Sequence, residues 1–297
     1  MKEQIRMFVG EDRKIQTGRD AEILLRETSD AKYVEEGCGI VRVPRDRWAM
    51  AQRYERGTWM DAAAHALDDR NYEHAANFDG YGALAGKSFD RAIELGCGPF
   101  TNLRVIGAMC EIKHCTLVDP LIPDYKKHRH CSYRHGILET GTTPLNSILG
   151  RSLTGRAVRR VIRNAIPSLL LSGVPIEQLI AAPIEAMPGC GQFELVVMIN
   201  VIEHCFDVHA ILETILRLCP RGALFVFHDR LYNAATVRRE AAERFDAGHP
   251  LKVDESLIVA FLHSSFQVLF ERRVDVKDEA VGVELTEPGV YFVGERK

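Results

Sequence analysis

Two glycines and two carboxylates mark the segment of this chain that is best suited to bind a nucleotide-like ligand. Glu94 is followed by Gly96 and Gly98 in the run ELGCGPFT, and Asp119 lies 21 residues after Gly98. Glycine permits a tight turn after a strand and lets a ligand approach the backbone closely. A carboxylate about 20 residues later has the spacing that reaches a ribose hydroxyl. Because Thr101 replaces the third glycine of a GxGxxG pattern, the glycines alone are a weak signal.

A second group of polar residues follows apolar runs further along the chain. Ligands of open α/β sheets bind beyond the carboxyl ends of the strands, so side chains at those positions can contact an acceptor or move a proton. Histidine suits proton transfer because its ordinary pKa is near 6.5. For His204, a packing or capping role is an open alternative. The candidates are Glu203, His204, His228 and Asp229, with His228 and Asp229 expected to act as a pair. His249, in the run AGHPLK ahead of the helix at 254–265, is a further candidate on the substrate side.

The elements that position these residues are short apolar runs alternating with helix-length stretches. Such alternation predicts a doubly wound, mostly parallel sheet. Helices are expected at 208–218 and 254–265, the second with Asp254 as its N-cap. The last two strands lack a crossover helix between them, so they are expected to pair antiparallel. The strand candidates are AIEL (92–95), CTLVD (115–119), QLIAA (178–182), ELVVMI (194–199), ALFVFH (223–228), FQVLFERR (266–273) and GVYFVGE (289–295).

The runs ELGCGP, LVDP and FELVVMINVIEHCFD, in this order, resemble the motifs of class I S-adenosylmethionine-dependent methyltransferases. The resemblance covers about residues 91–297. It implies a Rossmann-like α/β fold with a seven-strand, mostly parallel sheet and an antiparallel C-terminal strand. It also implies S-adenosyl-L-methionine as cofactor and S-adenosyl-L-homocysteine as product. The alternative, a dinucleotide-binding Rossmann domain, would need a third glycine and would not predict the run NVIEH.

The same resemblance assigns cofactor contacts to particular positions. The acid before the glycine turn would help place the methionine end, the acid after the second strand would hold the ribose, and a carbonyl after the fourth strand would lie near the cofactor amino group. One departure is Pro183, which stands where the family usually has an aspartate for the adenine. Backbone groups of Ile184 or Glu185 could replace it. The full set is Glu94, Gly96, Cys97, Gly98, Asp119, Pro120, Ile184, Glu185, Asn200 and Val201.

The chain before residue 89 is expected to form an N-terminal helical cap or lid (1–88) on the methyltransferase domain (89–297). Its helix, from Asp46 to about Leu67, has Gly57 as an expected interruption. Three aromatic residues of this helix, Trp48, Tyr54 and Trp59, either cover the substrate side of the site or staple the helix to the sheet.

A helical insert is expected at about 125–175, after the second strand. Its run 151–166 places apolar residues on one face and four arginines on the other. The arginines form either a solvated face or an anion-recognising surface. With Lys and Arg at 38, Asp and Glu at 41 and a formal net charge of −3, composition counts against nucleic acid as the partner.

Composition and cysteine spacing count against a membrane protein, a secreted disulfide-rich protein and a zinc protein. The start of the chain lacks an apolar signal region and no apolar run is long enough to cross a bilayer, so a cytoplasmic protein without membrane contact is expected. The eight cysteines lack disulfide-framework spacing. A zinc reading of the histidines and cysteines between 114 and 135 is disfavoured, because no paired CxxC or HxxxH spacing occurs there, and no metal is predicted.

Together these features predict a methyltransferase acting on an oxygen or nitrogen atom of a small-molecule acceptor. Secondary metabolism as its setting and a homodimer as its assembly are further expectations. Two alternatives stay open. One is RNA or protein methylation through the arginine-rich insert. The other is a non-catalytic, cofactor-binding partner subunit.

Overall fold

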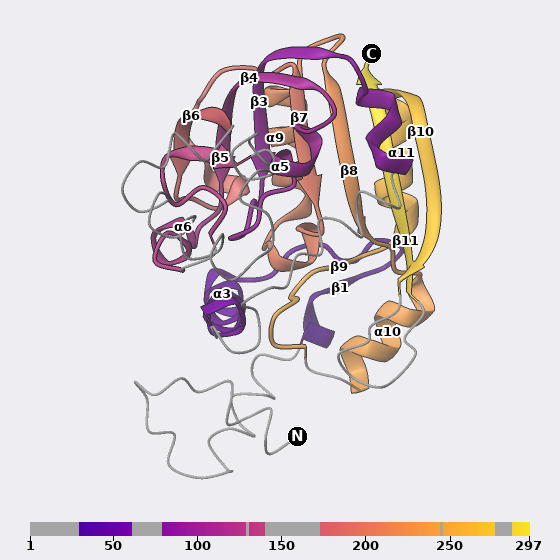
Figure 1. Ribbon diagram of the computed structural model, residues 1–297. Coiled ribbons are helices and arrows are strands. Elements are labelled where there is room, and N and C mark those ends of the chain that lie inside the picture. Colours follow the sequence, from indigo (N-terminus) through magenta and orange to yellow (C-terminus); the bar gives the residue numbers. More distant parts are fainter. Residues whose placement is uncertain (1–29, 61–78, 129–130, 140–172, 244–245, 277–286) are drawn as a thin grey trace, which may run out of the picture.

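An eight-stranded sheet crosses the centre of the molecule (Figure 1). The computed structural model describes residues 30–60, 79–128, 131–139, 173–243, 246–276 and 287–297. The strand order is β10-β11-β8-β7-β3-β4-β6-β5. The strands are β3 (Ser88–Leu95), β4 (Glu111–Val118), β5 (Ile137–Glu139), β6 (Gly173–Ile180), β7 (Leu195–Ile199), β8 (Leu224–Arg230), β10 (Phe266–Val276) and β11 (Glu287–Arg296).

The strand pairing confirms the mostly parallel, Rossmann-like sheet. The five strands β6, β4, β3, β7 and β8 are parallel to their neighbours in that order. β11 runs antiparallel to both β8 and β10, as the missing crossover helix predicts. All seven expected strands are present, and the short β5 adds an eighth, antiparallel to β6 at the sheet edge. The continuous burial of β7 reflects its position in the middle of the sheet.

Helices cover both faces of the sheet. α9 begins where the Asp207 side chain accepts a hydrogen bond from the Ala210 amide, and Asp254 caps α11 in the same way through Ser256. The expected helices at 208–218 and 254–265 are therefore confirmed. The helices and 3-10 turns of this part are α5 (Leu103–Ile106), α6 (Ile122–Tyr125), η4 (Ile184–Ala186), η5 (Ile202–His204), α9 (Val208–Leu218), α10 (Ala234–Glu243) and α11 (Glu255–Ser265).

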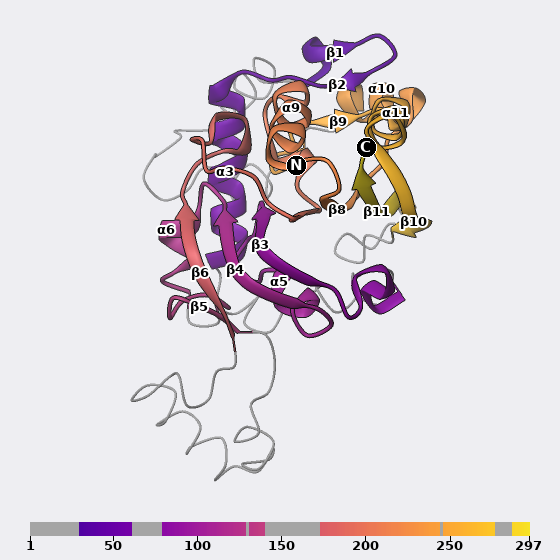
Figure 2. The same cartoon turned by 90° about the horizontal axis from the view of Figure 1, so that it is seen from above.

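Two hydrophobic cores lie on opposite sides of the sheet. Figure 2 shows α9 and α11 on one side and α5 on the other. The α9 side is filled by residues such as Ile211 and Ile215, and the α5 side by Leu103 and Ile106. Because each core anchors the strands from one face, the loops at the carboxyl edge extend from a rigid base.

The N-terminal part contributes one long helix and a small sheet. α3 (Arg45–Met60) contacts both α6 and η5, which follow β4 and β7, so it lies across the carboxyl edge of the large sheet. α3 runs through Gly57 without a break, which corrects the expected interruption. The remaining elements are η1 (Asp30–Tyr33), β1 (Val34–Glu35), β2 (Gly39–Ile40), η2 (Asp79–Leu84) and β9 (Lys252–Val253), with sheet order β1-β2-β9.

Several expectations fall on residues outside the described ranges. These are the rest of the cap (1–29 and 61–78) and most of the insert, including the arginine-rich run at 151–166. Of the insert, the described residues include the short strand β5.

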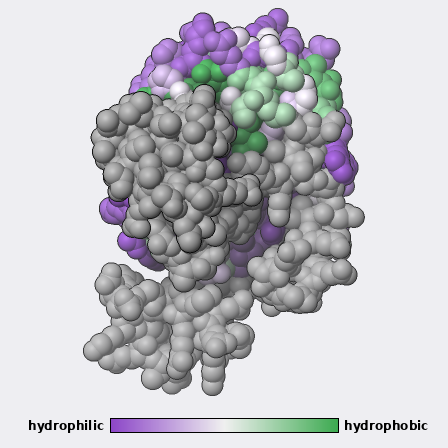
Figure 3. Space-filling model, viewed as in Figure 1, coloured by the Kyte–Doolittle hydropathy of each residue, from purple (hydrophilic) through white to green (hydrophobic). Residues whose placement is uncertain are grey.

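Apolar residues show at the upper right of the surface in Figure 3, the region where Figure 1 places β10 and α11. Among the described residues, the exposed large apolar side chains are Val268 and Leu269 of the edge strand β10. The homodimer stays a prediction. Within the described ranges, no helix has the length and apolar character that a membrane span requires.

Candidate active site

The glycine turn after β3 is held tightly by its neighbours. The amides of Gly96 and Cys97 both donate to the carbonyl of Val118 at the end of β4, at 2.8 and 3.1 Å. Gly96 has φ +70°, and a Cβ atom at this position would lie 2.5 Å from the methyl groups of Val201. Gly98 has φ +53°, yet its missing Cβ would meet no atom within 4 Å. The two glycines thus differ, since one allows close packing and the other opens onto free space.

Glu94 shapes the loop that follows this turn. It is fully buried at the end of β3. Its carboxylate accepts hydrogen bonds from the amides of Asn102 and Leu103 at 2.9 and 3.0 Å, and from the Thr101 hydroxyl. Burial raises its pKa, although these hydrogen bonds oppose the shift. Both oxygens are engaged by the loop, so Glu94 can place a ligand only through the backbone that it holds.

Asp119, directly after β4, faces the same turn. Its carboxylate accepts from the Gly98 amide at 3.1 Å and from the Leu121 amide at 2.8 Å. Burial raises the pKa of Asp119 to about 6, with a smaller contribution from the negative charge of Glu55. Pro120 follows it, half-buried, at the start of the turn into α6. The spacing from Gly98 therefore does bring the predicted carboxylate to the glycine turn.

Two residues that the sequence did not indicate hold the turn from its other side. The Tyr133 hydroxyl donates to the Gly98 carbonyl at 2.9 Å, and its ring is fully buried. The amide of Ser132 donates to the Pro99 carbonyl at 2.9 Å, and its hydroxyl accepts from the Thr101 amide at 3.2 Å. Nothing in the sequence between 126 and 136 indicates these contacts, because they depend on how the chain returns after α6.

The turn after β7 adopts a conformation that side-chain-bearing residues rarely take. Asn200 has φ +58°, in the left-handed region, and its amide donates to the His228 carbonyl at 2.8 Å. The amides of Val201 and Ile202 both donate to one Asp229 oxygen, at 3.1 and 2.7 Å. The turn that carries the candidate cofactor residues Asn200 and Val201 is therefore fixed by β8.

His228 and Asp229 do not meet as a pair. Adjacent residues of a strand point to opposite faces, and here each has its own surroundings. The His228 Nδ1 atom lies 3.0 Å from the Val290 carbonyl, and its ring stacks on Tyr291 with centroids 3.9 Å apart. Asp229 is bound to the β7 turn, and burial first, then the charge of Glu203, raise its pKa. Both side chains are buried within the sheet, with 2% of each residue exposed.

The segment after β6 is built around Pro183, which precedes η4. Ile184 is buried. The Glu185 carboxylate accepts from the amides of Phe206 and Asp207, at 2.7 and 3.2 Å. Glu185 thus holds the loop between η5 and α9 through its Oε1 atom, while its buried Oε2 atom has no hydrogen-bond partner among the described residues.

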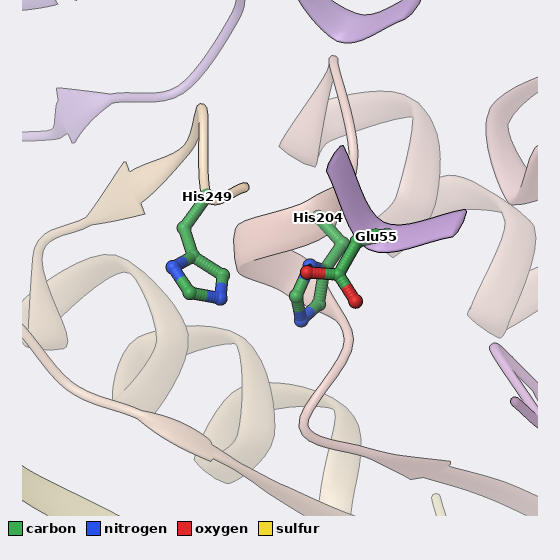
Figure 4. A group of neighbouring side chains, drawn as sticks. All are labelled: Glu55, His204 and His249. Atoms are coloured by element: carbon green, nitrogen blue, oxygen red, sulfur yellow. The ribbon is translucent and has the colours of Figure 1, made fainter. Parts of the chain in front are cut away.

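A cluster of two histidines and three carboxylates lies beside the β7 turn. Figure 4 shows three of its members, Glu55, His204 and His249. The rings of His204 and His249 are 4.6 Å apart between centroids. The Glu203 Oε1 atom lies 3.6 Å from His249 Nε2 and 3.8 Å from His204 Nε2. On the outer side, His249 Nδ1 lies 3.0 Å from both Asp246 oxygens. His204 Nδ1 lies 3.3 Å from the Gly248 carbonyl and 3.5 Å from Glu55 Oε1.

The charges of the cluster set opposite protonation states for its two imidazoles. Burial lowers the pKa of His204, which favours the neutral ring. Burial acts in the same direction on His249, but the carboxylates of Glu203 and Asp246 outweigh it and raise the pKa to about 9. For Glu203, burial would raise the pKa, yet the positive charges of His249 and Arg230 lower it to about 2. The cluster therefore holds one neutral and one protonated imidazole against a carboxylate at neutral pH.

α3 brings three aromatic residues against three different loops of the site. Trp48 packs edge-on against Phe206, with ring centroids 5.4 Å apart. Tyr54 lies against Gly248, where an added Cβ would stand 2.9 Å from its ring. Trp59 meets Phe100 of the glycine loop at 6.0 Å and donates from Nε1 to Glu55 at 3.1 Å. The helix is thus attached to the glycine turn and to the cluster at once.

The histidines and cysteines between 114 and 135 do not gather into a site among the described residues. Cys115 is buried in β4, His114 is exposed, and His128 lies edge-on to Phe100. In the described part of the chain, the residues that could jointly hold a metal ion are instead Glu55, His204 and His249, with one ligand atom of each within 4.8 Å of the others.

Comparisons with known proteins place this geometry in context. The model of a methyltransferase domain family matches residues 51–273. No curated protein matches the chain. Among solved structures, the N-methyltransferase NodS from Bradyrhizobium japonicum WM9, in complex with S-adenosyl-L-homocysteine, is 13% identical over 84% of this chain and 99% of that chain, with a TM-score of 0.48.

Two further structures have similar values. The 1,6-didemethyltoxoflavin-N1-methyltransferase from Burkholderia thailandensis is 12% identical over 89% of this chain and 98% of that chain, with a TM-score of 0.47. A chain of the complex between the Haloferax volcanii Trm112 methyltransferase activator and a methyltransferase is 14% identical over 86% and 99%, with a TM-score of 0.48.

Proposed function

The chain belongs to the S-adenosylmethionine-dependent class I methyltransferases, and from that premise we propose that it methylates an oxygen or nitrogen atom of a small-molecule acceptor. S-adenosyl-L-methionine supplies a methyl group already activated by its sulfonium, so the protein contributes orientation and exclusion of water. The enzyme's own residues then have two tasks. They must hold the cofactor at the glycine turn and hold the acceptor atom beside it.

The described residues at the carboxyl edge fit the cofactor. Gly98 opens onto space free of protein atoms, and the Asp119 carboxylate stands next to it. In the proposed arrangement the backbone of Gly96, Cys97 and Gly98 lies against the cofactor, and Asp119 with Pro120 receives the ribose. The Asn200 carbonyl, next to Val201, faces the amino group, and backbone groups at Ile184 and Glu185 meet the adenine. Glu94 acts on the cofactor through the loop that it binds.

The acceptor is proposed to bind at the cluster formed by His204, His249 and Glu203. The observation that carries this proposal is the position of Glu55 on α3. Its carboxylate lies 3.5 Å from His204, and its charge also contributes to the raised pKa of Asp119. One side chain thus links the cluster to the cofactor side. A neutral imidazole at His204 and a charged one at His249 suit an acceptor atom that must lose a proton.

The supporting residues have assigned roles in this proposal. Asp229 and His228 fix the β7 turn from β8, and their contribution to turnover comes through that turn. Trp48, Tyr54 and Trp59 cover the site by holding α3 across it, and water exclusion follows from that cover. All eight cysteines are free thiols, which supports work in the cytoplasm.

The direct test is production of S-adenosyl-L-homocysteine. Purified protein is incubated with S-adenosyl-L-methionine and separate fractions of cell extract: small molecules, RNA and protein. Product formed only with the small-molecule fraction supports the proposal. Product formed with the RNA or protein fraction contradicts it. Calorimetric binding of the cofactor without product in any fraction would identify a non-catalytic binding subunit instead.

A further inference from the structure

The cluster around His204 and His249 has the arrangement of a metal site. The two imidazoles, from η5 and from the loop before β9, lie edge to face with their ring centroids 4.6 Å apart. Glu203 Oε1 lies between their Nε2 atoms, 3.6 and 3.8 Å away. Ligand atoms around a metal ion at about 2.0–2.2 Å stand roughly 3–3.5 Å apart, so only a small contraction is needed. Glu55 offers a further carboxylate within 4.8 Å of both rings.

The unpartnered Oε1 atom of Glu203 independently indicates that a cation or a hydrogen-bond donor binds between the two imidazoles. Only 2% of the residue is exposed, and its Oε1 atom has no hydrogen-bond partner among the described residues. Its other oxygen accepts from the Tyr232 hydroxyl at 3.1 Å, which fixes the carboxylate in place. A buried, unpartnered carboxylate oxygen costs free energy unless a cation or a donor meets it. The orphaned atom points at both imidazoles.

The outer contacts fix each ring as a metal ligand requires. His249 Nδ1 is held by Asp246, and His204 Nδ1 by the Gly248 carbonyl. This leaves both Nε2 atoms directed inward. Metal-binding histidines characteristically give their second ring nitrogen to a carboxylate or carbonyl in this way.

The balance of charge favours a cation. Glu55, Glu203 and Asp246 bring three carboxylates to the cluster. Lys252 lies 3.1 Å from Asp246, and Arg230 lies 4.0 Å from Glu203. The two fixed cations leave one negative charge, which the proton on His249 balances in the metal-free protein. A bound metal ion would replace that proton and balance the charge in its place.

From these contacts we infer that the enzyme binds one divalent transition-metal ion between His204, His249 and Glu203, with the Glu55 carboxylate close by. Two imidazoles with a carboxylate suit a first-row metal such as zinc, manganese, iron or cobalt. A metal held by three protein ligands keeps positions open for an acceptor oxygen, whose hydroxyl it would acidify. The metal site itself does not depend on the proposed function. The nature of the acceptor does rest on it, and the metal site specifies an acceptor that carries a hydroxyl group.

Cobalt(II) is the probe for the test, because its visible absorption reports nitrogen and oxygen ligation. Metal-free full-length protein is titrated with Co²⁺ in the absence of cofactor and acceptor. One equivalent should bind and be displaced by Zn²⁺. His204→Ala and His249→Ala should each weaken binding at least 100-fold, and Asp246→Asn about 10- to 100-fold. Circular dichroism confirms that each variant is folded.

The matched control is His263→Ala. His263 also pairs with a glutamate, Glu271, at 2.7 Å, but this pair lies on the surface and has no second imidazole among its partners in the described residues. This variant should bind Co²⁺ as the natural chain does. If the natural chain binds no Co²⁺, or if neither the His204 nor the His249 variant weakens binding, the inference is wrong.

A second measurement needs no variant. In the Co²⁺ protein, proton NMR should show two exchangeable, hyperfine-shifted resonances from the Nδ1 protons of the two rings, and both should vanish in deuterated water. Their absence would also overturn the inference. A protein that forms S-adenosyl-L-homocysteine in the small-molecule assay but binds no metal would refute the metal site and leave the proposed function standing.

Discussion

Arg47 and Asp30 form a bidentate ion pair that is almost completely buried. Arg47 Nε lies 2.7 Å from one Asp30 oxygen and Nη2 lies 2.9 Å from the other. The same guanidinium donates to the carbonyls of Asp246 and Ala247, at 2.5 and 3.1 Å. Arg47 therefore ties the N-terminal segment and α3 to the loop that carries His249.

Removing Arg47 should destabilise the protein strongly. Arg47→Ala leaves the Asp30 carboxylate and two carbonyls without their donor, and breaking a buried pair costs about 3–5 kcal/mol. The free energy of unfolding in urea measures it. Arg42→Ala is the control, because Arg42 pairs with Asp207 at 2.6 Å while 64% of its side chain is exposed. That variant should lose less than about 1 kcal/mol. Equal losses in the two variants would contradict the assignment.

Gly96 and Gly98 should respond differently to alanine. Gly96→Ala places a methyl group 2.5 Å from Val201, so the thermal midpoint should fall sharply. Gly98→Ala meets no protein atom and carries only the strain of a positive φ. It should lower calorimetric affinity for S-adenosyl-L-homocysteine more than it lowers the midpoint. Full cofactor affinity in Gly98→Ala would show that the ligand lies elsewhere.

The double variant Gly96→Ala/Val201→Ala tests the packing explanation for Gly96. Shortening Val201 removes both methyl groups that a Cβ at position 96 would meet. The double variant should therefore be more stable than the sum of the two single effects predicts. Strict additivity would assign the loss to backbone strain alone.

Asp119 should give cofactor binding and stability opposite dependences on pH. Its pKa is raised by burial to about 6. The ribose needs the ionised carboxylate, so affinity for S-adenosyl-L-homocysteine should rise as pH increases through about 6. The free protein holds this proton more tightly than the unfolded chain does, whose carboxyl titrates near pH 3.9. The free energy of unfolding of the free protein should therefore decrease as pH rises from about 4 to 6.

The comparison for Asp119 is Asp119→Asn, which cannot ionise. Subtracting its unfolding free energies from those of the natural chain should leave a difference that falls with pH in this range. A difference that is flat from pH 4 to 7 would mean that Asp119 titrates alike in the folded and unfolded chains.

Tyr133→Phe should weaken the cofactor site without unfolding the protein. The change removes only the hydroxyl that donates to the Gly98 carbonyl. A hydrogen bond of this kind contributes about 0.5–1.5 kcal/mol. Affinity for S-adenosyl-L-homocysteine should therefore fall up to about tenfold by calorimetry. An unchanged affinity would mean that Tyr133 only packs the core.

The sequence predicted the parts of this molecule that depend on local pattern and spacing. The central strand expected at 194–199 could be recognised because its residues 195–199 are all apolar, as in a parallel strand buried on both faces. The contact between Asp119 and Gly98 follows from the spacing within one strand-helix-strand unit. Asp254 indicated the start of α11 because an N-cap side chain binds the backbone amides of the next few residues in the sequence.

The remaining features depend on contacts between distant segments, which no local pattern encodes. Tyr133 reaches Gly98 only through the return of the chain after α6. The expected pairing of His228 with Asp229 overlooked the alternation of side chains along a strand. Glu55 was not singled out, because a glutamate in a charged helix has no distinguishing sequence signal until α3 is placed across the sheet.

The close approach of Gly96 to Val201 has an evolutionary consequence. The turns after β3 and β7 share one small space, so the two positions constrain each other across more than a hundred residues of sequence. Among descendants of this gene, a side chain could be accepted at position 96 only after a permissive mutation had first shortened position 201. Ancestral reconstruction can recover the order of the two substitutions, and the steric clash with the two Val201 methyl groups is what would determine it.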